Sequence, residues 1–364
     1  MTKIASFSTI AGALLAFGLS AAPAQAGPNR TWVSGHGTDS GSCTLAAPCR
    51  TFAFALTQTA AGGEIDVLDP AGYGPLTITK AIGIVNDGVG TAGINAVSGA
   101  TAITINAGAS DSVHLRGLTI EGLGSGSIGI QFDTGGNLAI ENCVIRNFAT
   151  AGINIVPSTS SSFSVSSTIV SNNLANGILV VPIVSAVVTG VLSEVTANSN
   201  FNGIFVNGRL TTGASLNVTI VDSVASNNHS FGVVAASASG NAATAVTLRN
   251  VVARNNGTGL GAGRNAILRV AHSVVTGNNT GVNTSGDGIL NSYVDNDING
   301  NTSDNTTVLT RSRCIDEPSA LEGRLRRPSR RAAGGLSRGA TVRLKDRPRP
   351  GHSTTTRVPT LTRS

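Results

Sequence analysis

The feature that most constrains the fold is a short motif that returns about every 25 residues. The stretch VVARNNGTGL at residues 251–260 has relatives in TIVSNNLANGI from Thr168, SVASNNHSFGV from Ser223 and VVTGNNTGV from Val274. In each copy, Asn is followed three to five residues later by Gly and an aliphatic residue. Aligned on this Asn, six copies follow one another at steps of 23 to 29 residues: Asn147, Asn172, Asn198, Asn227, Asn255 and Asn278. A period of this length is typical of solenoids.

The residue types of the motif indicate short strands joined by tight corners. Gly and Asn adopt the left-handed backbone of a sharp turn with the least strain, and Asn stacked on Asn can link side-chain amides from coil to coil. Leucine-rich repeats also carry a periodic Asn, but their Leu framework is missing here, and propeller blades need about 40 residues or more. The chain has 45 Gly and only 4% aromatic residues, which suits coils built from small and β-branched side chains. The repeat therefore predicts a parallel β-helix with the six Asn as its structural ladder.

A resemblance supports this prediction. The Gly-Ile-x-Val and Asn-Asn repeats, with the opening segment CRTFAFALTQTAAGGEIDVLDPAGYGPLTI at residues 49–78, resemble the right-handed parallel β-helix (pectate-lyase-like) superfamily. The resemblance implies an all-β chain: a single right-handed parallel β-helix of roughly ten coils over residues 64–310. A loop and a short capping helix, expected at 51–61, fill residues 27–63 and cover the open edge of the first coil. Such motifs identify a fold and not an activity.

The two ends of the chain differ from this repeat. Residues 1–26 read as a signal peptide, with Lys3, an apolar run over 10–22 and Ala24-Gln25-Ala26 as the cleavage site, so the product is expected to be secreted, periplasmic or on the cell surface. No later stretch approaches the roughly 18 apolar residues of a membrane span. Residues 311–364 hold 14 of the 25 basic residues and only four acidic ones. We expect this tail to be disordered. It is either an arm for an anionic polymer or a segment without function, such as a shifted reading frame would give, and its lack of aromatic residues favours the second.

The cysteines fit an oxidising compartment. Cys43 and Cys49 lie in a Gly/Ser/Pro-rich loop without a second Cys/His pair nearby, which favours a local disulfide over a metal site. Cys143 lies within a strand pattern and is expected to be a buried free thiol.

The chemistry-bearing residues are sparse. In the strand after each repeated Gly the aliphatic residue points inward, so the next residue points outward, and none of these carries a charge: Gln131, Asn154, Leu179, Phe205, Val234, Gly261 and Asn283. This sheet offers no acid/base pair and no metal site. The densest charged patch lies over residues 111–146, where coil alignment sets Arg116 beside Glu141 and Glu121 beside Arg146. Such pairs are more typical of surface ion pairs than of a catalytic centre. If the protein is an enzyme, the catalytic candidates are Asp133, Glu141 and Arg116.

Two classes of function remain. The first is an exported, non-catalytic scaffold that binds polysaccharide or another cell-surface component; the second is a carbohydrate-active enzyme, a polysaccharide lyase or glycoside hydrolase. The sequence favours the first, although scarce aromatic residues weaken both, because sugar-binding clefts usually stack rings on such side chains. We expect a monomer that binds no nucleic acid and has no cofactor. The alternative to having no cofactor is a calcium ion in the last coil, at Asp295, Asp297 and Asp304. These residues do not have the spacing of an EF-hand.

Overall fold

The computed structural model describes residues 27–305 and 310–311, which belong to one compact unit. The predicted signal peptide and the predicted basic tail beyond residue 311 lie outside the described residues.

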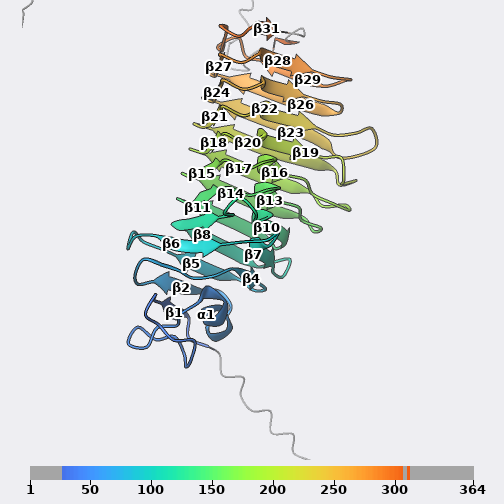
Figure 1. The fold of residues 1–364 in the computed structure, drawn as a ribbon. Helices are drawn as coiled ribbons and strands as arrows, with labels where there is room; N and C mark the ends of the chain where they lie inside the picture. The colour runs from blue at the N-terminus through green and yellow to red at the C-terminus, as the bar shows by residue number, and fades with distance from the viewer. Residues whose placement is uncertain (1–26, 306–309, 312–364) are drawn as a thin grey trace, which may run out of the picture. The chain divides into compact units, whose positions relative to one another are not determined.

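The described chain winds through three parallel sheets, one strand of each per coil, so that strands stack into a ladder (Figure 1). Sheet 1 has twelve strands: β1 (Arg30–Val33), β2 (Gly63–Val67), β5 (Ile82–Val85), β8 (Ser112–Arg116), β11 (Asn137–Glu141), β14 (Ser161–Ser166), β17 (Val188–Ser193), β20 (Ser215–Val221), β23 (Ala243–Arg249), β26 (Ala266–Ala271), β29 (Ile289–Ser292) and β32 (Thr310–Arg311). Sheet 2 has ten: β3 (Ala71–Gly72), β6 (Ala92–Asn95), β9 (Leu118–Glu121), β12 (Val144–Arg146), β15 (Ile169–Ser171), β18 (Thr196–Asn198), β21 (Val224–Ser226), β24 (Val252–Arg254), β27 (Val274–Thr276) and β30 (Asp297–Ile298). Sheet 3 also has ten: β4 (Leu76–Ile78), β7 (Thr101–Asn106), β10 (Ile128–Thr134), β13 (Ala151–Ile155), β16 (Asn176–Val180), β19 (Asn202–Asn207), β22 (Phe231–Ala236), β25 (Thr258–Ala262), β28 (Thr280–Thr284) and β31 (Ser303–Asn305).

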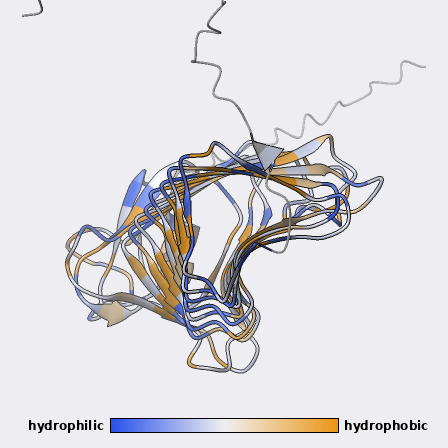
Figure 2. Cartoon of the chain, turned by 90° about the horizontal axis from the view of Figure 1, so that it is seen from above, coloured by the Kyte–Doolittle hydropathy of each residue, from blue (hydrophilic) through white to orange (hydrophobic). Residues whose placement is uncertain are grey.

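Alternation along each strand builds the core. In β20, Leu216, Val218 and Ile220 are buried, whereas the intervening Asn217 and Thr219 face solvent. Because successive side chains of a strand point to opposite faces, a coil with apolar residues at every second position fills the interior with one layer of aliphatic side chains. Viewed along the stack, the coils superpose, so these layers form one continuous column (Figure 2).

The corners of the coils from residue 142 to residue 277 use a left-handed backbone at two positions, five residues apart. The first follows sheet 1, as at Asp222 (φ 49°), and the second follows sheet 2, as at Asn227 (φ 56°). The second row comprises Asn147, Asn172, Ser199, Asn227, Asn255 and Gly277. The prediction of Asn198 and Asn278 in this row was therefore wrong. Asn198 is the last residue of β18 and pairs with Ser171 and Ser226, and Ser199 takes the corner.

The hydrogen-bonded Asn ladder lies one residue beyond this corner row. Its buried members are Asn173, Asn200, Asn228, Asn256 and Asn278, and it continues to Asn301. Each side-chain amide donates to the Oδ1 atom of the next member, at 2.8, 3.2, 2.9, 3.0 and 2.8 Å along the series. The same Oδ1 atoms accept backbone amides, for example that of Asn200 onto Asn228 at 3.0 Å. In the copies at Asn172, Asn227 and Asn255 the first Asn turns the corner and the second links the coils, whereas in the last copy Gly277 turns the corner and the first Asn, Asn278, links the coils.

The N-terminal end is covered by a helix, as predicted, but with an extra strand before it. Helix α1 (Phe52–Gln58) begins after Thr51, whose side chain accepts the amide of Phe54, and it packs on β1, β2 and β4. Strand β1 pairs in parallel with β2, so sheet 1 begins at residue 30 rather than at the expected residue 64. Cys43 and Cys49, the predicted pair, are joined by a disulfide. No helix in the described part of the chain is long and apolar enough to cross a membrane.

Candidate functional site

The outer face of sheet 3 carries the row of outward residues that the sequence predicted. The register pairs Gln131 with Asn154, Leu179 with Phe205, Phe205 with Val234, and Val234 with Gly261, so these side chains follow one another along the stack. No residue of the row is charged. Its first coils are polar, with Asn154 donating to the Oε1 atom of Gln131 at 2.8 Å, and its middle coils are apolar.

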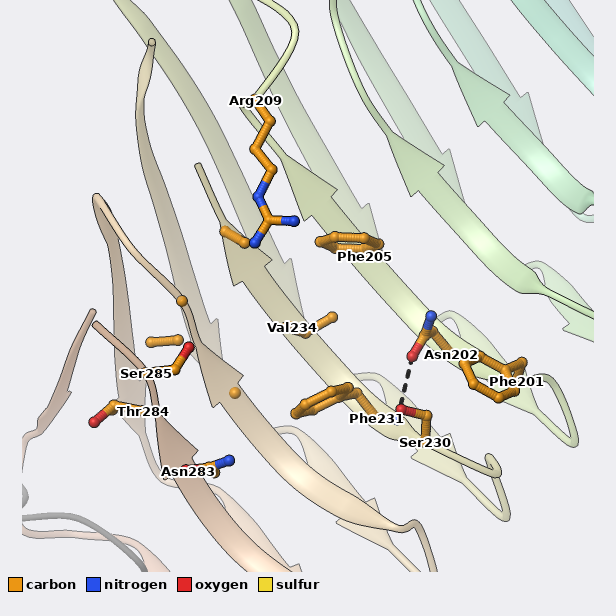
Figure 3. Close-up of a pocket in the computed structure, with 14 residues that line it drawn as sticks. Phe201, Asn202, Phe205, Arg209, Ser230, Phe231, Val234, Asn283, Thr284 and Ser285 are labelled. Atoms are coloured by element: carbon orange, nitrogen blue, oxygen red, sulfur yellow. Dashed lines mark hydrogen bonds between the residues drawn. The ribbon is translucent and has the colours of Figure 1, made fainter. Parts of the chain in front are cut away.

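A groove of about 300 Å³ lies on this face across β19, β22, β25 and β28. Figure 3 shows the rings of Phe205 and Phe231 on either side of Val234, with Arg209 at one side of the groove. The lining residues are Phe201, Asn202, Phe205, Arg209, Ser230, Phe231, Val234, Ala236, Gly261, Ala262, Gly263, Asn283, Thr284 and Ser285. This set combines aromatic rings with amide and hydroxyl groups and one guanidinium, and it contains no carboxylate.

The groove gathers three aromatic residues that lie outside the buried core. Phe201 is 44% exposed, and its ring lies 5.3 Å, centroid to centroid, from that of His229 on the next coil. Phe205 and Phe231 are half-buried on sheet 3. Phe52, Phe132, Phe148 and Phe163, by contrast, are buried in the core. Although aromatic residues are scarce in the chain, three rings therefore meet at one surface site.

Arg209 supplies the positive charge of the groove. It is exposed, and its Nε atom donates to the backbone carbonyl of Ser237 at 3.4 Å. Among the described residues it forms no ion pair with a carboxylate. Its charge is therefore available to an anionic group of a ligand.

The predicted catalytic candidates lie elsewhere and do not share a cleft. Arg116 and Glu141 are neighbours in the register of sheet 1, as predicted. However, the Nε atom of Arg116 lies 3.5 Å from Asp87, and Glu141 lies 3.4 Å from the Nε2 atom of His114. Asp133 is on sheet 3 and accepts a hydrogen bond from Gln131 in its own strand.

The second predicted pair forms a tight contact on sheet 2. The Nε atom of Arg146 lies 2.7 Å from Glu121, whose other oxygen accepts a hydrogen bond from the side chain of Asn147. Glu121 is thus held by two groups from the following coil, and the contact joins β9 to β12.

Two acidic residues of the last coil, Asp295 and Asp304, accept backbone hydrogen bonds. Asp295 accepts the backbone amide of His272 at 3.0 Å, and Asp304 accepts the amide of Asn301 at the same distance. Within residues 27–305, no group of three or more His, Cys, Asp and Glu side chains is placed to hold a metal ion.

Two further titratable groups are structural. Burial raises the pKa of the Cys143 thiol to about 11, so the thiol stays protonated at neutral pH. At the N-terminal end, the amide of Gly35 and the hydroxyl of Ser34 donate to Asp69 at 2.6 Å each and lower the pKa of its carboxyl group. Asp69 thereby fixes the loop before the disulfide to the first coil.

No protein-family model and no curated protein matches the sequence. Among solved structures, the chain is similar to the crystal structure of pectate lyase Pel9A, with a TM-score of 0.49 and 16% sequence identity over 76% of this chain and 80% of that one. It is also similar to ORF18 of Geobacillus virus E2, with a TM-score of 0.36 and 10% identity over 65% of this chain and 52% of that one. Neither similarity bears on activity.

The fold is the parallel β-helix that the resemblance predicted. This conclusion follows from the parallel register of the three sheets.

Sequence analysis missed Phe201, Phe231 and Arg209. One signal could have found Phe231: the residue before each repeated Gly also faces outward, which makes a second row with Asn176, Asn202, Thr258 and Thr280. Phe201 and Arg209 lie in corners, where alternation does not apply.

Proposed function

We propose that the protein is an exported, non-catalytic scaffold that binds an acidic polysaccharide in the groove on sheet 3. The observation that carries the proposal is the lining of the groove, which has three Phe rings, a polar side at Asn283 and Ser285, and the guanidinium of Arg209. Rings stack on the apolar faces of sugars, hydroxyl and amide groups bind sugar hydroxyls, and a guanidinium binds a carboxylate or sulfate.

The absence of carboxylates from the lining of the groove supports binding without cleavage. Glycoside hydrolysis needs two carboxyl groups within about 10 Å of each other, on either side of the scissile bond. The candidate carboxylates Asp133 and Glu141 lie on different sheets and contact Gln131 and His114. The predicted signal peptide and the disulfide between Cys43 and Cys49 support export.

Binding is tested by titrating the purified mature protein with polygalacturonate, the acidic probe, and with dextran, the neutral one. We expect binding of polygalacturonate that weakens with salt and about tenfold lower affinity for Arg209→Gln, which corresponds to about 1.4 kcal/mol. The matched control is Arg249→Gln, which changes the net charge by the same amount. Arg249 is exposed at the end of β23 and forms no ion pair among the described residues.

A reducing-end assay and an absorbance assay for unsaturated uronates are run on the same samples. We expect no product in either. Sustained turnover would favour the enzyme hypothesis instead, and equal losses in the two Arg variants would show that the groove is not the binding site.

A further inference from the structure

The ring of Phe231 lies over a glycine of the next coil. Gly261 is the outward residue of β25 that pairs with Val234 of β22. A β-carbon added at Gly261 would lie 2.6 Å from Cε1 and 2.9 Å from Cδ1 of Phe231, closer than such atoms approach. The ring therefore occupies the space that a side chain at position 261 would fill.

The backbone does not explain this glycine. Gly261 lies inside a regular strand and is not in the left-handed region, and glycine weakens the interior of a strand. Every neighbour in the same outward row carries a side chain: Gln131, Asn154, Leu179, Phe205, Val234 and Asn283. The row is thus interrupted only at the coil on which the Phe231 ring rests.

We propose that Gly261 is the positioning residue of the groove, because its missing side chain lets the Phe231 ring lie against β25. With the ring held there, the groove stays open between Phe231 and the polar side at Asn283 (Figure 3). A methyl group at position 261 would push the ring away from β25 and into the space that a sugar ring would take. This inference rests on the proposed function of the groove.

The test is a double-mutant cycle in the full chain with Gly261→Ala, Phe231→Ala and the double variant. Affinity for polygalacturonate and the thermal midpoint Tm are measured for each protein. We expect Gly261→Ala to lower affinity about three- to tenfold and to lower Tm, since the ring must move. In the Phe231→Ala background the same change should alter affinity by less than about twofold and should not lower Tm, because the methyl group then has room.

The matched control is Gly83→Ala. Gly83 pairs with Glu64 in sheet 1, and an added β-carbon would meet only the Glu64 side chain, at 3.5 Å. We expect unchanged affinity.

The outcomes separate this inference from the proposed function. If Gly261→Ala lowers the affinity equally with and without the Phe231 ring, the positioning role is overturned. The effect of the substitution would then come from the backbone at position 261 and not from the ring. If Phe231→Ala weakens binding and Gly261→Ala does not, the groove still binds the glycan and only the positioning role is wrong. If the unaltered protein does not bind polygalacturonate, the proposed function fails, and the role of Gly261 in binding fails with it.

Discussion

The early and later coils of the solenoid use the same residue types in opposite ways. In the early coils the rings of Phe132 and Phe148 are fully buried, and Arg116 and Arg146 form ion pairs with Asp87 and Glu121. In the later coils Phe201, Phe205 and Phe231 lie on the surface. Within residues 201–305 no arginine forms an ion pair with a described carboxylate; these arginines are Arg209, Arg249, Arg254, Arg264 and Arg269.

The early and later coils also differ in the residue that fills the interior of the second corner. Phe148 fills the second corner of its coil, and its backbone amide donates to Asn173, the first member of the Asn ladder. From Asn173 onward, an amide takes the place of the ring in each corner. The comparison shows that the charged patch over residues 111–146 forms ion pairs between the early coils and does not form the candidate site. The candidate site lies on the face of sheet 3 where exposed rings and an arginine come together.

The largest expected effect tests the difference between buried and exposed rings. Phe132→Ala should lower the free energy of unfolding by about 3–5 kcal/mol, because a fully buried ring leaves a cavity. Affinity for polygalacturonate should not change, since Phe132 does not line the groove. Chemical denaturation and titration measure the two quantities. A loss of less than about 1 kcal/mol would mean that the early coils do not depend on buried rings.

A smaller loss of unfolding free energy is expected when the hydrogen-bonded Asn ladder, which replaces the rings in the later coils, is broken. The side chain of Asn228 accepts two hydrogen bonds from Asn200 and donates to Ala197 and Asn256. Asn228→Ala leaves buried polar groups without partners and should lower the free energy of unfolding, measured by chemical denaturation, by about 3 kcal/mol.

The control for the ladder is its exposed neighbour. Asn227 turns the corner with φ at 56°, and its Oδ1 atom accepts an exposed hydrogen bond from Asn255 at 3.3 Å. Asn227→Ala should lower the free energy of unfolding by only about 1–2 kcal/mol, mainly the strain of a left-handed alanine, because the lost hydrogen bond is exposed to water. Equal losses at the two positions would contradict the assignment of the ladder to the second Asn of the motif.

The exposed rings should affect binding more than stability. Phe205→Ala should lower affinity for polygalacturonate about tenfold, or about 1.4 kcal/mol, since an aromatic face is lost from the groove. The free energy of unfolding should change by less than in Phe132→Ala, because Phe205 is only half-buried. If Phe205→Ala keeps full affinity but loses as much unfolding free energy as Phe132→Ala, the buried and exposed rings do not differ in role.

The smallest effect is expected in the charged region. Glu141 is 43% exposed and its partner His114 is 40% exposed, so Glu141→Gln should change the free energy of unfolding by at most about 1 kcal/mol. Polygalacturonate affinity should stay the same. Uronate-cleaving activity that disappears in this variant would show that the early coils hold a catalytic centre after all.

The sequence by itself determined the local rules of the fold. The period of the Asn-Gly motif, the alternation of apolar residues and the residue types of the corners predicted a parallel β-helix with a capping helix and an outward row that includes Phe205 and Val234. These predictions succeeded because a strand's alternation and a left-handed corner depend only on residues close together in the chain.

Only the tertiary structure decided how the coils meet. Corners stay five residues apart and accept Ser199 and Gly277 as well as Asn, so alignment on Asn alone placed two wrong residues, Asn198 and Asn278, in the corner row. Arg116 pairs with Asp87 rather than with its register neighbour Glu141. Phe205 and Phe231 come from different coils, and the ring of Phe231 lies over Gly261 of a third. Such contacts depend on side-chain directions between coils, and these are set by the packing of each coil on the next, which no local pattern in the sequence records.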